Sequence, residues 1–421
     1  MTNDNLPLTI PMTIDNLLNL DGHKTKTMTS RERFVTALLN GIPDRVPVAP
    51  DISNYLPAKR TGLPYWDIYL YNRYPLWQSY LETADYFGMD AWIGASAGPS
   101  LTWGASRCEY LTRDEYVADI DAMVRHTTIR TPDGDMTCAS TVMRREPPSP
   151  TEKPMKDLAA DWKKWRWRLQ PPTGIDHKPT DEIREQCRKR GHAFGLSVSY
   201  PGFQIWNEYI QDGIAQLSFA IEDHPEILQE WYELELAIGT KIVELTLSLQ
   251  PDYILFGGSG TITLSSPELA RRFAIPPLAL WTKMCKDAGV PSMLHSCGKS
   301  RVLVDMLADE TDMNCINPLE IPPMGDVILA EVKAARGLQI ALMGNLHTTQ
   351  TMLFGTPELV RRRSIEAMRD AGIGGGFILS TGDQCGRETP DENLFALVEA
   401  AKTLGIYDRA SGALPHLEEI D

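Results

Sequence analysis

The chain of 421 residues lacks any long uninterrupted hydrophobic run, and it contains only seven cysteines. Without an apolar stretch of about 20 residues, no transmembrane helix is predicted. The first twenty residues contain no lysine or arginine, so the charged start of a secretory signal is missing and we expect a cytoplasmic protein. Seven cysteines without clustered spacing argue against a disulfide framework and leave reduced thiols as candidate metal ligands.

Positively charged residues are also fewer than negatively charged ones. The chain has 41 lysines and arginines against 56 aspartates and glutamates, a formal net charge of −15. This balance argues against nucleic acid or an anionic membrane surface as a partner, and it weakens any interpretation that needs a strongly anionic substrate. With 43% hydrophobic and 23% charged residues, the composition is that of an ordinary globular protein able to bury a large core.

Short apolar segments alternate with helical segments of about 10 to 20 residues through most of the chain. Such alternation predicts a parallel sheet with crossover helices, and eight units predict a TIM (β/α)8 barrel of the α/β class. Chemistry in such barrels takes place at the C-terminal ends of the strands. The segments predicted as strands are residues 46–50, 90–94, 193–198, 252–256, 291–295, 313–316, 338–343 and 376–380.

Two further parts are predicted outside the barrel core. Residues 1–29 are expected to form an N-terminal helical arm, and residues 30–421 the catalytic barrel domain. An arm of this kind could lie on a neighbouring subunit, so a homodimer is one possible assembly. Within it, two alternating runs flank a Pro-Asp-Gly turn at residues 132–134. This pattern predicts an antiparallel β-hairpin insertion over about residues 103–170. We expect the tryptophans at its end to pack under a loop rather than to form a substrate lid; they are Trp162, Trp165 and Trp167.

The residues His295 and Cys297 lie at the end of one predicted strand, and Cys385 follows another. Alternation along a strand turns His295 and Cys297 to the same side. If both strands belong to one barrel, three soft ligands meet at its rim. This set matches a catalytic zinc site, in which three protein ligands leave the fourth position open. The alternative is a buried histidine beside an inert thiol.

Polar residues follow other predicted strands at the same rim. Asp51 and Asn345 lie at strand ends, Tyr253 lies in a strand, and Glu320 comes just beyond residues 313–316. We expect Asp51, Tyr253 and Asn345 to contact the substrate, although roles in turns and caps explain them equally well.

Several motifs together resemble the uroporphyrinogen decarboxylase superfamily over most of residues 30–407. This resemblance implies the barrel fold independently of the strand pattern. The motifs are His295-Ser296-Cys297-Gly298, Asn317-Pro318-Leu319-Glu320, Met343-Gly344-Asn345-Leu346, Gly355-Thr356-Pro357-Glu358 and Thr389-Pro390-Asp391-Glu392-Asn393.

Two branches of the superfamily differ in their chemistry. True decarboxylases need no metal and hold a polycarboxylate tetrapyrrole with paired arginines after the first strand, which residues 50–60 lack. The other branch contains cobalamin-dependent methyltransferases similar to methylcobalamin:coenzyme M methyltransferase, with a His-x-Cys and a distant Cys as zinc ligands. His295, Cys297 and Cys385 match that pattern, and the resemblance implies that Glu320 completes the zinc shell as a catalytic carboxylate.

The chain departs from this branch at one point. Gly382-Asp383-Gln384 precedes Cys385, whereas relatives tend to have glycine directly before the cysteine, so we expect a slight shift of this ligand. A zinc ion with two thiolates and one imidazole is formally neutral and can accept one more anion.

The sequence therefore predicts a zinc-dependent methyltransferase that exchanges a methyl group with a cobalamin (corrinoid). We expect a separate corrinoid protein to supply this cofactor, because the chain has no Asp-x-His-x-x-Gly signature. The small-molecule methyl donor or acceptor stays open among a thiol, tetrahydrofolate, and a methyl ether, amine or sulfide. The alternatives are a metal-free uroporphyrinogen-type decarboxylase and a non-catalytic corrinoid-binding scaffold.

Overall fold

Six parallel strands form the largest sheet of the computed structural model, which describes residues 27–418. Their spatial order follows the chain, and each strand pairs in parallel with the next, as expected for successive βα units. The strands are β7 (Gly195–Ser199), β8 (Tyr253–Gly257), β9 (Ser292–His295), β10 (Cys315–Asn317), β11 (Ala341–Leu346) and β12 (Phe377–Thr381).

Two further extended segments close this sheet into a barrel. Val48 pairs in parallel with Leu379 of β12, and Trp92 pairs in parallel with Ala193 just before β7. The two segments join each other through the Asp90 N–H, which donates to the Val48 carbonyl at 2.7 Å. The predicted strands 46–50 and 90–94 thus complete the ring, and the predicted TIM barrel is confirmed. Their pairing is short, in part because prolines 47 and 50 cannot donate to a ladder.

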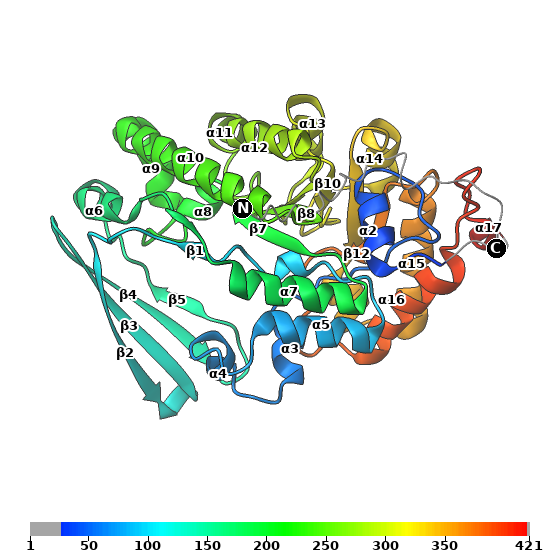
Figure 1. The fold of residues 1–421 in the computed structure, drawn as a ribbon, viewed down its shortest axis with the longest axis horizontal. Helices are drawn as coiled ribbons and strands as arrows, with labels where there is room; N and C mark the ends of the chain where they lie inside the picture. The colour runs from blue at the N-terminus through cyan, green and yellow to red at the C-terminus, as the bar shows by residue number, and fades with distance from the viewer. Residues whose placement is uncertain (1–26, 419–421) are drawn as a thin grey trace, which may run out of the picture.

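Helices surround the barrel on its outside (Figure 1). A capping box formed by Thr29 and Glu32 starts the first of them. None of the helices within residues 27–418 has the length and apolar character needed to cross a bilayer. They include α2 (Ser30–Leu38), α3 (Tyr55–Arg60), α5 (Leu76–Phe87), α7 (His177–Arg190), α8 (Phe203–Trp206), α9 (Ile214–Asp223), α10 (Pro225–Ser248), α11 (Pro267–Phe273), α12 (Ile275–Asp287), α13 (Arg301–Glu310), α14 (Leu329–Arg336), α15 (Pro357–Ala371), α16 (Asp391–Leu404) and α17 (Pro415–Glu418).

The structure divides the helical segment at residues 66–87 and describes only the end of the predicted N-terminal arm. Residues 66–87 have helical character, and the structure divides them into two helices, α4 (Tyr65–Tyr69) and α5. Asn72 has a positive φ of 46° and Pro75 precedes α5, and both features interrupt helical hydrogen bonding. Of the predicted N-terminal arm, residues 1–26 lie outside the described residues.

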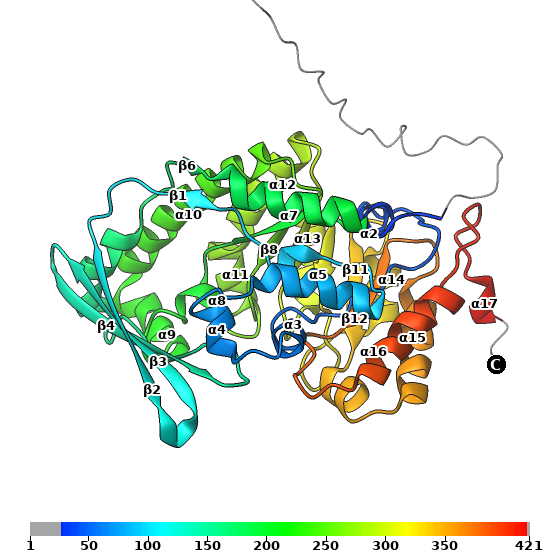
Figure 2. The ribbon, with the colours of Figure 1, turned by 60° about the horizontal axis from the view of Figure 1, so that its bottom comes forward.

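The insertion forms a second, antiparallel sheet at one end of the molecule (Figure 2). Its four strands are β2 (Glu109–Val117), β3 (Ala122–Thr131), β4 (Gly134–Met143) and β5 (Ser149–Glu152). The predicted hairpin is the β3–β4 pair. Trp162 and Trp165, from α6 (Leu158–Trp165), are buried in one hydrophobic cluster with Trp206 and Trp231. These two tryptophans therefore pack in a core, as expected.

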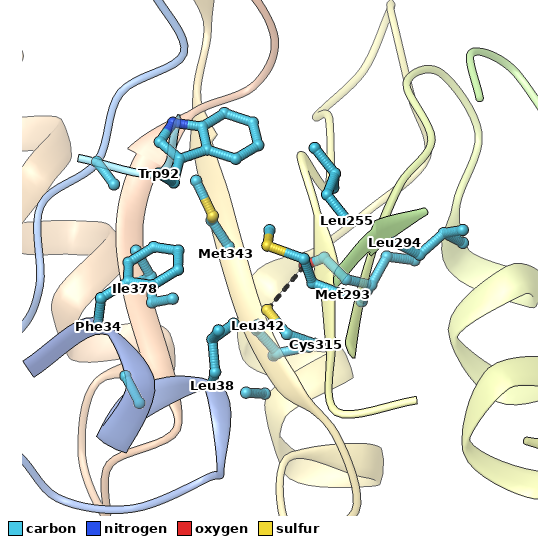
Figure 3. Close-up of a cluster of buried hydrophobic side chains, with 14 of the residues drawn as sticks. Phe34, Leu38, Trp92, Leu255, Met293, Leu294, Cys315, Leu342, Met343 and Ile378 are labelled. Carbon is cyan, nitrogen blue, oxygen red and sulfur yellow. Dashed lines mark hydrogen bonds between the residues drawn. The ribbon is translucent and has the colours of Figure 1, made fainter. Parts of the chain in front are cut away.

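Buried hydrophobic side chains from several barrel strands and from α2 pack in one cluster (Figure 3). Leu255, Met293 and Cys315 are register partners on β8, β9 and β10 and are buried. Phe34 from α2 packs against Tyr253, with ring centroids 5.4 Å apart, near the start of the strands. Because apolar side chains fill this part of the barrel, polar chemistry is left to the opposite end, where the strands finish.

Candidate functional site

A cavity of about 390 Å³ lies at the C-terminal ends of the barrel strands. His295, at the end of β9, lines it together with Asp51, which follows the strand segment 46–50. Trp92 and Gly94 from the second strand segment contribute to the same wall. Polar residues from distant parts of the chain are therefore brought to one rim, as in other TIM barrels.

Three potential metal ligands meet beside this cavity. The thiol of Cys297 and carboxylate oxygens of Glu320 and Asp383 all lie within 4.8 Å of one another. His295 extends this group, since its Nε2 lies 3.9 Å from Asp383 Oδ1. Glu320 is 6% exposed, so at least one of the carboxylates is held away from bulk water. The arrangement offers sulfur, nitrogen and oxygen donors around one point, and these are the donors that zinc accepts.

A glycine fixes the relative positions of Cys297 and Glu320. The N–H of Gly298, which directly follows Cys297, donates to Glu320 Oε2. Gly298 has a φ of +80°, and a Cβ at this position would lie 2.2 Å from Oγ1 of Thr263. Only glycine fits this conformation and this space without strain. The turn after β9 is therefore built around the contact between the cysteine segment and the carboxylate.

Hydrogen bonds hold the loop after β12. The Thr381 hydroxyl donates to the Asp383 carbonyl at 2.7 Å and accepts from the Asp51 N–H at 3.0 Å. Further along, the Cys385 N–H donates to the Asp51 carbonyl at 2.8 Å. This loop is thus attached to the first strand segment.

The electrostatics of the site disfavour negative charge in the absence of a cation. Burial, with the nearby charges of Asp383 and Glu320, raises the pKa of Cys297 to about 11. Burial likewise raises the pKa of Glu320, with the Gly298 N–H opposing the shift. Burial also raises the pKa of Asp51. A bound divalent cation would reverse each of these preferences, because it favours the charged forms.

The group of three potential ligands contains two of the four predicted metal ligands. Cys297 and Glu320 lie in the group with Asp383, and His295 is next to it. Cys385 is fully buried and is not among the three residues of that group. Burial raises the pKa of Cys385 to about 12, and the charge of Asp51 adds to this shift. The set of His295, Cys297, Cys385 and Glu320 as ligands stays a prediction.

The predicted substrate contacts occupy different places. Asp51 lines the main cavity, whereas Asn345 lines a separate space of about 10 Å³ with Glu320 and Gly382, roughly enough for one water molecule. Tyr253 is buried inside the barrel, and its hydroxyl accepts from the Gly94 N–H at 2.9 Å. Tyr253 thus supports the cavity wall through Gly94, and its contact with substrate stays a prediction.

Sequence reasoning missed two residues of this site. Asp383 was noted only as part of a departure from the methyltransferase pattern, although a carboxylate two positions before Cys385 offered the signal. Asn317 ends β10 opposite His295 in the register, so both side chains face the same side. Asn317 is fully buried, and neither polar atom of its amide has a hydrogen-bond partner in the part of the chain that the structure describes.

The comparison with known protein families covers the second half of the barrel. Residues 254–404 match the family model described as Uroporphyrinogen decarboxylase (URO-D), a segment that contains the His-x-Cys motif and Glu320. This matched segment, about a third of the chain, is similar to the uroporphyrinogen decarboxylase family.

Relatives and solved structures extend this result. Uroporphyrinogen decarboxylase of Nostoc punctiforme is 37% identical over 141 residues, which cover 33% of this chain and 37% of the relative. That of Anaeromyxobacter dehalogenans is 30% identical over 142 residues, covering 33% and 38%. The matches thus span less than two fifths of these relatives. A structure described as "methyltransferase from Methanosarcina mazei" is similar with a TM-score of 0.60 at 17% identity, and the match covers 89% of this chain and 98% of that chain. This likeness shows a shared fold.

Proposed function

We propose that this protein is a zinc-dependent methyltransferase that moves a methyl group between a small molecule and a corrinoid carried by a partner protein. The observation that carries the proposal is the convergence of Cys297, Glu320, Asp383 and His295 beside a cavity at the rim of the barrel. Similarity to the fold of a Methanosarcina mazei methyltransferase supports it.

The donor set fits zinc better than other common cations. Mg²⁺ and Ca²⁺ prefer sites made entirely of oxygen, whereas a thiolate with an imidazole and carboxylates suits zinc. Bound there, zinc would act as a Lewis acid on a methyl ether, thioether or amine, or would lower the pKa of a thiol acceptor. The corrinoid would supply or take the methyl group.

The residues of the chain have separate roles in this proposal. Glu320 is the catalytic carboxylate: the Gly298 N–H occupies one of its oxygens, and the other would bind the metal and could leave it when substrate arrives. Asp51 binds substrate from the cavity wall, and Asn345 does so beside Glu320. Tyr253 keeps the wall in place through Gly94.

The charge of the residues that line the cavity limits which substrates it can accept. Asp51 and Glu208 line it, and no lysine or arginine does so among the described residues. An acidic pocket repels a polycarboxylate such as uroporphyrinogen and admits a neutral or cationic molecule. A volume of about 390 Å³ also lies near the lower end for small-molecule pockets. Both properties favour a small methyl donor or acceptor over a tetrapyrrole.

A metal-free uroporphyrinogen-type decarboxylase is the second candidate, because the family model and the curated relatives carry that description. Metal analysis and two activity assays separate the candidates. We expect about one equivalent of zinc and zinc-dependent methyl transfer to or from free methylcobalamin, followed by its absorption spectrum. Less than about a tenth of an equivalent of metal, with CO₂ release from uroporphyrinogen intact, would establish the decarboxylase instead.

Variants test the role of the candidate metal ligands Cys297, Glu320, Asp383 and His295. Cys297→Ala should abolish both zinc binding and methyl transfer. Cys138→Ala, on a strand of the insertion where the thiol is only partly buried, is the matched control and should retain both. If Cys297→Ala and the wild type bind methylcobalamin equally and neither turns over, the protein is a non-catalytic corrinoid-binding scaffold and the proposal fails.

A further inference from the structure

Asp383 lies where the sequence pattern leads one to expect Cys385. We propose that Asp383 takes the coordination position that resemblance to the methyltransferase branch assigns to Cys385, so that the metal is bound by one sulfur, from Cys297, and two carboxylates. The inference rests on the proposed function only in that the site holds a divalent metal ion. His295 supplies the nitrogen donor of the same set.

The distances fit a shared ion. Ligand atoms bound to one zinc ion lie about 2.0 to 2.3 Å from it, so two of them are separated by roughly 3 to 4.5 Å. Donor atoms of Cys297, Glu320 and Asp383 lie within 4.8 Å of one another, and His295 Nε2 lies 3.9 Å from Asp383 Oδ1. Small rotations of these side chains bring all four to bonding distance.

Backbone and side-chain hydrogen bonds attach the Cys385 segment to the chain that follows the first strand. The Cys385 N–H donates to the Asp51 carbonyl at 2.8 Å, and the neighbouring Gln384 amide donates to the Ser53 hydroxyl at 3.1 Å. The Cys385 side chain is fully buried, whereas that of Asp383 is 35% exposed. The carboxylate of Asp383 already lies within 4.8 Å of the donor atoms of Cys297 and Glu320, and Cys385 is not part of that group.

A second observation indicates that this layer of the barrel receives a polar partner. Asn317 faces the same side of the sheet as His295, which lines the cavity. Its amide is buried and lacks a hydrogen-bond partner within residues 27–418. An unpaired buried amide costs about 1 to 3 kcal/mol, so a bound ion with its water or substrate would satisfy groups that the chain leaves unpaired.

The substitution of a carboxylate for a thiolate changes what the site can accept. Cys297, Glu320 and Asp383 together carry three negative charges when ionised, one more than zinc neutralises. An added thiolate would raise this excess further, whereas a neutral ether, sulfide or amine would not. The acidic lining by Asp51 and Glu208 acts in the same direction, so removal of a methyl group from a neutral or cationic donor fits the site best.

Cobalt substitution in the full chain tests this ligand set without reference to activity. Charge transfer from sulfur to Co²⁺ in the near ultraviolet grows with the number of Co–S bonds. We expect the wild type to show one Co–S contribution, Cys385→Ser and Cys385→Ala to retain its full intensity, and Cys297→Ser to lose it. Asp383→Asn should lower zinc affinity by about tenfold or more in competition with a chromophoric chelator. Asp383→Cys should add a second Co–S contribution.

The outcomes separate this inference from the proposed function. If the cobalt band of the wild type falls by half in both Cys385 variants, Cys385 is a ligand and the inference is overturned, while the zinc enzyme stands. Unchanged zinc affinity in Asp383→Asn overturns it as well. If the wild type binds neither Zn²⁺ nor Co²⁺, the proposed function itself fails. Far-ultraviolet circular dichroism of each variant checks that it has folded.

Discussion

A half-buried carboxylate connects the tryptophan cluster to the wall of the cavity. Glu235, on α10, accepts hydrogen bonds from Nε1 of Trp206 and of Trp231, each at 2.7 Å. Burial raises its pKa to about 7, and the two indole N–H groups oppose this shift. Trp206 ends α8, whose Gln204 lines the cavity. Ionisation of Glu235 therefore affects both stability and the support of the site.

The direction and size of the effect follow from the two pKa values. The ordinary pKa is 4.5 and the folded value is about 7, so the folded state binds the proton more tightly than the unfolded state. Stability conferred by the neutral form is present below pH 4.5 and is lost as the pH rises through about 7. At about 1.4 kcal/mol per pKa unit, the full loss is about 3 kcal/mol.

The variant Glu235→Gln removes the titration while keeping one acceptor for an indole N–H. We expect urea unfolding to show that the wild type loses about 2 to 3 kcal/mol more than the variant between pH 5 and pH 8. Glu233→Gln, an exposed glutamate on the same helix, is the control and should follow the wild type. Parallel pH dependences of the wild type and Glu235→Gln would show that Glu235 is already ionised at pH 5 and would refute the reasoning.

Three other perturbations test the site and the fold. Gly298→Ala places a Cβ 2.2 Å from Thr263 Oγ1 in a residue with positive φ. It should lower the free energy of unfolding by about 2 kcal/mol and weaken zinc binding. Unchanged zinc affinity in chelator competition would contradict the role of this turn. Arg33→Met removes the partner that lies 2.7 Å from buried Asp90 and should cost about 3 kcal/mol in urea unfolding, so a loss below about 1 kcal/mol would argue against a structural ion pair. Zinc, but not magnesium, should raise the melting temperature of metal-stripped protein, and equal shifts with both ions would indicate a site without sulfur.

The sequence by itself determined the architecture of the barrel. Apolar segments separated by helical ones occur at 252–256 and 291–295, and the structure has strands at Tyr253–Gly257 and Ser292–His295. Local rules suffice here, because strand and helix periodicity depends on neighbouring residues and their burial. The same alternation placed His295 and Cys297 at the rim. Residues 66–87 have a helical composition throughout, but Pro75 and the residues before it divide the segment into α4 and α5.

Only the tertiary structure decided which residue after β12 lies beside Cys297 and Glu320. Cys385 was the natural choice by residue type, but the structure directs Asp383 there. The reason is that Asp51, which lies 330 residues before Thr381, bonds to the loop through both its N–H and its carbonyl. The direction of a loop side chain depends on such distant partners, whereas that of a strand residue follows from local alternation. Periodicity along the chain therefore specified the barrel, whereas the position of Asp383 beside Cys297 and Glu320 depends on contacts between distant parts of the chain.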